Sequence, residues 1–187
     1  MLGVLTTVYP AALPFLGDFL EGLKNQTDND FTLFIVNDGV DELGELSSEQ
    51  NFEIRVLAAS GTPAALRRQG IGWAERDGAD WIISIDADDI CAVERVARTR
   101  ASRNGADGLF NDLVMFGEQI TDEIPYLYSR FKAGDAVRPG ALIGMNFLGL
   151  SNTAARAGLL KSSAARIPDD VIAFDWALFS RMALDGA

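Results

Sequence analysis

Histidine is absent from the 187 residues of this chain, and cysteine occurs once, at Cys91. Without histidine the chain cannot supply a Ser-His-Asp triad, a Cys-His pair, an imidazole general base or a histidine ligand for zinc. A single cysteine allows no disulfide within the chain, and the start MLGVLTTVYP lacks the pattern of a signal peptide. We therefore expect a cytoplasmic location and acid-base chemistry carried by Asp, Glu, Lys, Tyr or the one Cys.

Basic residues are scarce as well, with 16 Lys and Arg against 27 Asp and Glu and a formal net charge of −11. Nucleic acids and anionic lipids are bound through cationic side chains that neutralise phosphates, so this balance disfavours both. The most apolar late stretch, 141–150, is interrupted by Asn146. It is shorter than the roughly 20 residues that cross a bilayer. We expect neither a nucleic-acid partner nor a membrane span in this chain.

Short runs of β-branched and aliphatic residues alternate with stretches of helical spacing. This alternation predicts βαβ units and an α/β protein with a mainly parallel, Rossmann-like sheet, and the length fits one domain. The expected strands are 3–8, 31–36, 52–57, 81–85, 108–117 and 143–150. The expected helices are 13–23, 63–76, 93–101, 153–161 and 174–184.

An acidic cluster follows the fourth expected strand, in the stretch WIISIDADDI at 81–90. Asp86 and Asp88 lie two residues apart, so both carboxylates would point to the same side of an extended segment. Carboxylate oxygens suit a hard divalent cation, Mg²⁺ or Mn²⁺, which would also explain how the cluster tolerates its own charge. A second interpretation stays open: Asp88 or Asp89 caps the next helix and Asp86 forms a turn.

A further polar group, Asn37-Asp38-Gly39, follows the second expected strand. Open parallel sheets bind ligands at the carboxyl ends of their strands, so we expect this group and the acidic cluster to line one crevice. Asp-Gly is also a common turn pair, which leaves a purely structural interpretation of Asp38 open.

Six motifs, in order, resemble those of family 2 glycosyltransferases. They are TVYP (7–10), LKNQT (23–27), IVNDG (35–39), LRRQGI (66–71), GADWIISIDADD (78–89) and FDWALFSRMALDG (174–186). The resemblance spans the whole chain and implies a single GT-A domain, a three-layer α/β/α sandwich. Its nucleotide-binding part would cover about 1–104 and its acceptor part about 105–187. The DxD-type motif implies a nucleotide-sugar donor held with Mn²⁺ or Mg²⁺.

The resemblance also implies roles for donor-binding residues. Thr7 lies in the first-strand motif that contacts the nucleotide sugar. Asp38 would accept a hydrogen bond from the ring N-H of the base, and Arg67 would lie against the base or the diphosphate. Asp86 would bind the ribose hydroxyls, while Asp88 would hold the metal that bridges the diphosphate oxygens. By itself, Arg67 fits a solvated helix arginine equally well.

The late motif implies that Asp175 is the general base, which deprotonates an acceptor hydroxyl so that it attacks the anomeric carbon and inverts its configuration. Asp169 and Asp170 are rival bases, and Asp175 could also be a helix cap. Two positions depart from the family pattern: Phe174 stands where Glu is usual, and Arg68 stands where Asn is usual. The first change removes a carboxylate that normally supports the base.

The leading hypothesis is a metal-dependent, inverting glycosyltransferase that moves a sugar from a nucleoside-diphosphate sugar, expected to be a UDP-sugar, to a hydroxyl acceptor, expected to be a saccharide. A non-catalytic nucleotide-sugar binding module of the same fold is the alternative, motivated by Phe174. A sugar-1-phosphate nucleotidyltransferase is the third hypothesis. It is disfavoured because such enzymes carry a Gly-rich, Arg-containing loop where this chain reads TVYPAALP.

Overall fold

The computed structural model describes residues 1–41, 43, 50–117, 125–127, 130–142 and 144–186. Its strands are β1 (Leu2–Val8), β2 (Thr32–Asn37), β3 (Glu53–Ala58), β4 (Trp81–Ser84), β5 (Gly108–Phe110) and β6 (Thr153–Arg156). Its helices are α1 (Leu13–Lys24), α2 (Pro63–Arg76), α3 (Arg95–Ser102), α4 (Ala157–Ala164) and α5 (Phe174–Leu184), with 3-10 turns η1 (Pro10–Ala12) and η3 (Pro139–Leu142).

The strands form one sheet in the order β3-β2-β1-β4-β6-β5. β1 pairs in parallel with β2 and β4, and β2 pairs in parallel with β3. β6 runs antiparallel between β4 and β5. The carboxyl ends of β1, β2, β4 and β5 therefore meet at the same edge as the amino end of β6.

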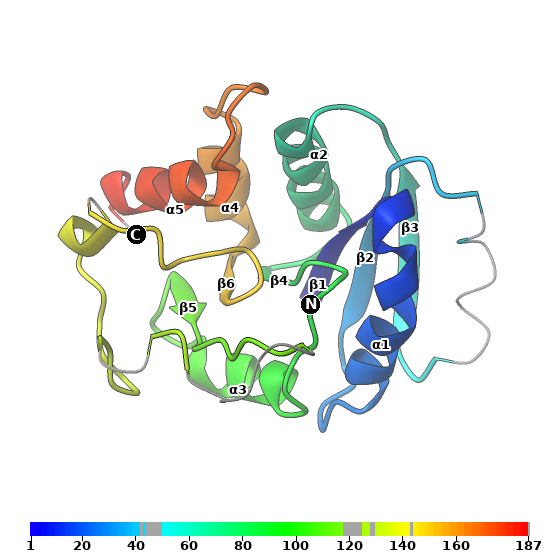
Figure 1. Ribbon diagram of the computed structural model, residues 1–187. Helices are drawn as coiled ribbons and strands as arrows, with labels where there is room; N and C mark the ends of the chain where they lie inside the picture. Colours follow the sequence, from blue (N-terminus) through cyan, green and yellow to red (C-terminus); the bar gives the residue numbers. More distant parts are fainter. Residues whose placement is uncertain (42, 44–49, 118–124, 128–129, 143, 187) are drawn as a thin grey trace.

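Two apolar cores lie on opposite faces of this sheet, because successive strand side chains point to opposite sides. In β1, Leu5 belongs to the core under α2, α4 and α5, whereas Val4 belongs to the core under α1 and α3. Figure 1 shows the two groups of helices on either side of the strands. The predicted three-layer α/β/α architecture with a mainly parallel sheet is confirmed.

Helix α2 begins and packs for local reasons that are visible in its sequence. Thr62 accepts a hydrogen bond from the Ala65 N-H at 3.2 Å, and Pro63 occupies the first turn, where its missing N-H costs nothing. A Cβ placed on Gly70 would lie 2.6 Å from the Val36 Cγ2 atom. Only glycine therefore allows this close approach of α2 to the sheet.

Most predicted elements agree with the structure, since the first four expected strands match β1 to β4 to within one residue. The expected strand at 143–150 is wrong: its described part, 144–150, has no strand. The sixth strand instead occupies Thr153–Arg156, where a helix was expected to begin. Ala154 and Ala155 are 1% and 0% exposed between the neighbouring strands, so tertiary pairing overrides the weak strand propensity of alanine there.

The expected strand at 108–117 is also shorter than predicted. β5 ends at Phe110, and beyond it Val114 forms only an isolated antiparallel bridge with Pro125. The division near residue 104 into a nucleotide-binding part and an acceptor part stays a prediction. Within the described residues, every helix is too short or too polar to cross a bilayer.

Candidate functional site

The acidic cluster forms a tight turn after β4. Ala87 is 2% exposed and packs in the core, whereas Asp86 is half-buried and Asp88 is exposed. The Asp89 N-H donates to the Asp86 carbonyl oxygen at 3.0 Å, so the turn expected at Asp86 is confirmed. The alternative that Asp88 or Asp89 caps the next helix is wrong, because α3 begins only at Arg95.

The Asp86 side chain faces two polar groups from other parts of the fold. The backbone N-H of Asp86 donates to Ser151 Oγ at 3.0 Å, and the Ser151 hydroxyl donates to Asp86 Oδ2 at 3.3 Å. Arg67 Nη2 lies 3.7 Å from Asp86 Oδ1. Burial raises the pKa of the Asp86 carboxyl, although Arg67 opposes this shift. The carboxylates of Asp89 and Asp88 raise that pKa further, so the protein's own residues leave part of the cluster's charge uncompensated.

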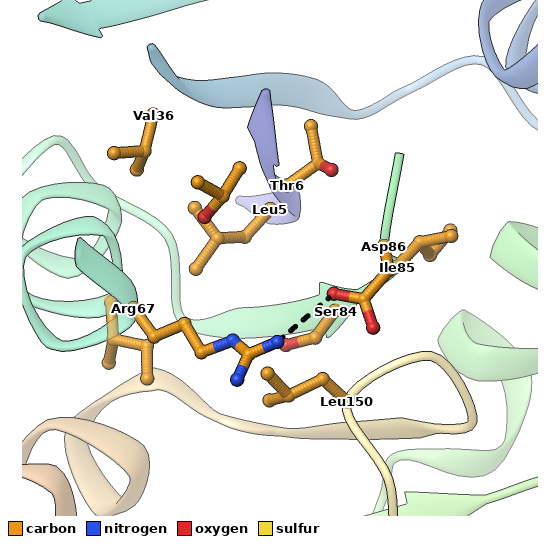
Figure 2. Close-up of a pocket in the computed structure, with 10 residues that line it drawn as sticks. Leu5, Thr6, Val36, Arg67, Ser84, Ile85, Asp86 and Leu150 are labelled. Carbon is orange, nitrogen blue, oxygen red and sulfur yellow. Dashed lines mark ion pairs between the residues drawn. The ribbon is translucent and has the colours of Figure 1, made fainter. Parts of the chain in front are cut away.

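A small pocket of about 20 Å³ lies beside this ion pair, with room for little more than a water molecule. It is lined by Leu5, Thr6, Thr7, Val36, Arg67, Ile71, Ser84, Ile85, Asp86 and Leu150. Figure 2 shows the Arg67 side chain extending toward Asp86, with Leu150 beside it. The structure thus brings together three of the predicted donor-binding residues: Thr7, Arg67 and Asp86.

Asp38 lies at the same edge of the sheet but does not line this pocket. Its backbone N-H donates to the Val8 carbonyl oxygen at 2.9 Å, which extends the pairing of β1 with β2. The preceding Asn37 side chain bonds both backbone groups of Val40, and Gly39 adopts a φ of +77°. The turn interpretation is confirmed, and a contact between Asp38 and a base stays a prediction.

Asp175 is the second residue of α5, and both of its carboxylate oxygens accept hydrogen bonds. Oδ1 accepts from the Trp176 N-H at 2.8 Å, and Oδ2 accepts from Asn146 Nδ2 at 3.2 Å. Asp175 therefore satisfies one free N-H in the first turn of its own helix. It is not the helix cap, because the N-cap position is Ala173, which makes no side-chain cap hydrogen bond. Phe174 is 1% exposed in the core, so the position where the family usually has Glu serves packing here.

The rival base Asp169 is engaged elsewhere. Its carboxylate forms a short ion pair with Arg68, which also donates to the Ile167 carbonyl oxygen at 2.8 Å. Thr62 Oγ1 donates to the Asp169 carbonyl oxygen at 2.7 Å. Arg68, the second departure from the family pattern, thus ties α2 to this loop. Asp170 is exposed.

Segment 146–152 contacts two of the candidate site residues, a feature that the sequence analysis missed. Asn146 contacts Asp175 at one end of it, and Ser151 contacts Asp86 near the other. Asn152 is 0% exposed and holds the segment in place: its Nδ2 donates to the carbonyl oxygens of Phe147 at 2.9 Å and Asn111 at 3.2 Å. The only signal in the sequence was the interruption of an apolar stretch by Asn146.

The acidic turn can hold a divalent cation only with help from a ligand. Within the described ranges, no group of three or more Asp, Glu or Cys side chains is placed to enclose a metal ion. Mg²⁺ is commonly bound through one or two carboxylates, with substrate phosphates and water completing its shell. Asp86 and Asp88 at an accessible edge fit a metal bound in that way.

Comparison with known families supports the motif analysis. The profile of glycosyl transferase family 2 matches residues 4–109, more than half of the chain. The chain belongs to glycosyl transferase family 2. The matched range includes the predicted donor-binding and metal-binding positions. Asp175 and segment 146–152 lie beyond it, in the part of this family 2 chain that the match leaves unassigned.

Solved structures show the same fold at low sequence identity. The structure of residues 1–349 of S. aureus TarS in complex with UDP-GlcNAc has a TM-score of 0.72 and 18% identity, covering 98% of this family 2 chain and 53% of that one. A 4-diphosphocytidyl-2C-methyl-D-erythritol synthase has a TM-score of 0.58 and 18% identity. The similarity covers 95% of this family 2 chain and 84% of the synthase chain. The chain thus spans about half the length of this TarS structure. No curated protein sequence matches it.

Proposed function

We propose that this glycosyltransferase domain moves a sugar from a UDP-sugar to a hydroxyl of a saccharide acceptor, with Mn²⁺ or Mg²⁺ and with inversion at the anomeric carbon. One observation carries the proposal. Asp86 and Asp88 flank the buried Ala87 at the carboxyl edge of the parallel strands, and Asp86 lines a pocket together with Thr7 and Arg67. The UDP-GlcNAc bound by the similarly folded TarS supports the choice of donor.

Donor binding would replace contacts that the protein makes with itself. Arg67 and Asp86 face each other at 3.7 Å across a pocket with little free space. A UDP-sugar would separate them, so that Arg67 contacts the diphosphate or the base while Asp86 accepts hydrogen bonds from the ribose hydroxyls. Thr7 would line the same site, and Asp38 would accept a hydrogen bond from the uracil N-H.

Asp88 would hold the divalent metal, together with diphosphate oxygens and water. The bound metal would stabilise the negative charge that develops on the departing diphosphate. The exposure of Asp88 fits this role, since a carboxylate buried among protein groups could not reach a ligand. Such a metal would also neutralise an acidic cluster that Arg67 compensates only in part.

Asp175 would act as the general base. The acceptor hydroxyl gives its proton to an Asp175 carboxylate oxygen, its oxygen bonds to the anomeric carbon, and the bond from that carbon to UDP breaks. Segment 146–152 connects this carboxylate to the donor site, because it contacts both Asp175 and Asp86. Asp169 is the weaker candidate, since Arg68 already pairs with its carboxylate.

The proposal is tested by titrating UDP, GDP, CDP and dTDP into the protein with and without Mn²⁺. We expect Mn²⁺-dependent binding of UDP that Asp88→Ala weakens at least tenfold, which is about 1.4 kcal/mol. Asp18→Ala on the exposed face of α1 is the matched control and should leave binding unchanged. Binding of no nucleotide in any condition would refute the donor site.

A second experiment separates transfer from binding alone, a distinction that the buried Phe174 makes necessary. Wild type and Asp175→Ala would be compared for release of UDP from UDP-GlcNAc with a panel of saccharide acceptors. We expect release by the wild type and a loss of about 100-fold or more in the variant. Binding of UDP without turnover of any nucleotide sugar would favour the non-catalytic module. Release of diphosphate from UTP and a sugar 1-phosphate would favour a nucleotidyltransferase.

A further inference from the structure

The candidate base is held from outside its own helix by one side chain. Asn146 Nδ2 donates to Asp175 Oδ2 at 3.2 Å, while Asp175 Oδ1 accepts from the Trp176 N-H at 2.8 Å. We infer that Asn146 is a positioning residue that fixes the Asp175 carboxylate for proton transfer, an inference that rests on the proposed function. The family match ends at residue 109, so it assigns no role to Asn146.

The position of Asn146 is itself tightly set. Asn152 accepts a hydrogen bond from the Gly149 N-H at 2.8 Å and donates to the Phe147 carbonyl oxygen at 2.9 Å. Phe147 is 2% exposed, so the residue next to Asn146 is anchored in the core. A side chain whose backbone is held in this way presents its N-H donor in one place, which is what precise orientation of a base requires.

The hydrogen bonding of Asn146 indicates a role beyond packing. Its Oδ1 atom is buried and has no hydrogen-bond partner in the part of the chain that the structure describes. Burying an unpaired amide oxygen is costly, and an apolar side chain of similar size would avoid that cost. The feature that the amide adds at this position is the N-H donor to Asp175.

Phe174 explains why such a donor would be needed here. Its side chain lies in the core, so the residue before Asp175 cannot support the carboxylate. The support comes instead from Asn146, which approaches from a loop 29 positions earlier in the chain. An amide does not titrate, so it remains a donor to Asp175 at every pH at which the domain is folded.

The test compares Asn146→Ala and Asn146→Asp with two control variants, Asn25→Ala and Asn25→Asp. Asn25 Nδ2 also donates to a carboxylate, Glu21 Oε1 at 2.9 Å, but at an exposed site at the end of α1. UDP release from UDP-GlcNAc with saccharide acceptors would be measured for each protein. We expect Asn146→Ala to lower kcat about 10- to 100-fold with the donor KM changed less than about twofold.

Asn146→Asp separates positioning from packing, because aspartate has the shape of asparagine but replaces the N-H donor with a negative oxygen. We expect it to lower kcat at least as much as Asn146→Ala. Both control variants should turn over like the wild type. An Asn146→Asp enzyme with near-normal kcat, or one that changes only the donor KM, would overturn the inference while leaving the proposed function in place.

A spectroscopic measurement tests the contact without turnover. The side-chain amide signal that disappears in Asn146→Ala would be identified in a ¹H-¹⁵N NMR spectrum and followed in Asp175→Ala. We expect that signal to shift in Asp175→Ala and to stay unchanged in Asn25→Ala. An unmoved signal would overturn the inference. If the wild type turns over no nucleotide sugar, the proposed function fails, and the inference fails with it.

Discussion

The two parts of the sheet are held together by different means. β1 and β2 pair at six consecutive positions, and β2 and β3 pair at six more, all through backbone groups. β5 and β6 pair at only three positions. Beyond these short strands, side chains hold the backbone: Asp112 accepts from the N-H groups of Leu113 and Leu127, and Asn152 bonds three backbone groups.

This difference affects how each side of the site responds to mutation. A backbone ladder does not depend on any one polar side chain, so Thr7 on β1 and Asp86 in the turn just after β4 are supported by strands that should tolerate most substitutions near them. The loop that reaches Asp175 depends on individual amides. We therefore expect the base side of the site to be the more fragile of the two, and three substitutions test this comparison.

Asn152→Ala should have the largest effect. It removes partners from the carbonyl oxygens of Phe147 and Asn111 and from the Gly149 N-H, at a residue that is 0% exposed. Leaving such groups unpaired should lower the free energy of unfolding by at least about 3 kcal/mol, measured by urea denaturation. Asn51→Ala, which removes one exposed bond to Lys24, should cost less than about 0.5 kcal/mol. Equal losses in the two variants would show that the amide does not hold the loop.

Gly70→Ala tests the parallel part of the sheet, formed by β1, β2, β3 and β4. There, the tight packing of α2 against the sheet contributes to stability, rather than a hydrogen bond from a side chain. The new Cβ would lie 2.6 Å from Val36 Cγ2, so we expect a loss of about 1 to 2 kcal/mol in the free energy of unfolding. Gly17→Ala, in α1 with nothing within 4 Å, should instead stabilise the domain by up to about 1 kcal/mol through helix propensity. Urea denaturation would measure the free energy of unfolding of both variants. An unchanged free energy of unfolding in Gly70→Ala would contradict the close approach of α2 to the sheet.

Asp28→Asn should have the smallest effect, because the ion pair between Asp28 and Arg100 is only partly buried and remains accessible to solvent. The hydrogen bond from Arg100 lowers the pKa of the Asp28 carboxyl, so its stabilisation is present above the unfolded-state pKa of about 3.9 and is lost as the pH falls through the folded-state value. We expect a loss of about 0.5 to 1 kcal/mol at pH 7 that shrinks below pH 4. Asp18→Asn is the control, and a loss independent of pH would exclude the ion pair as its cause.

Much of the parallel part could be predicted from the sequence. FTLFIV is a near-continuous apolar run, which is typical of a strand buried on both faces, and Thr62-Pro63 marks the start of α2. The placement of Asp86 and Asp88 at a strand end was also predictable, because they directly follow the apolar run WIISI. β6 was not, because Thr153–Arg156 carries little strand propensity and becomes a strand only between β4 and β5.

The sequence by itself determined the α/β fold class, the positions of the first four strands and the strand end at which the acidic turn lies, because periodicity and local capping are properties of neighbouring residues. Only the tertiary structure decided that Arg67 faces Asp86, that Arg68 pairs with Asp169, and that Asn146 supports Asp175. Each of these contacts joins residues at least 19 positions apart, and no local pattern encodes which distant side chains a folded chain brings together.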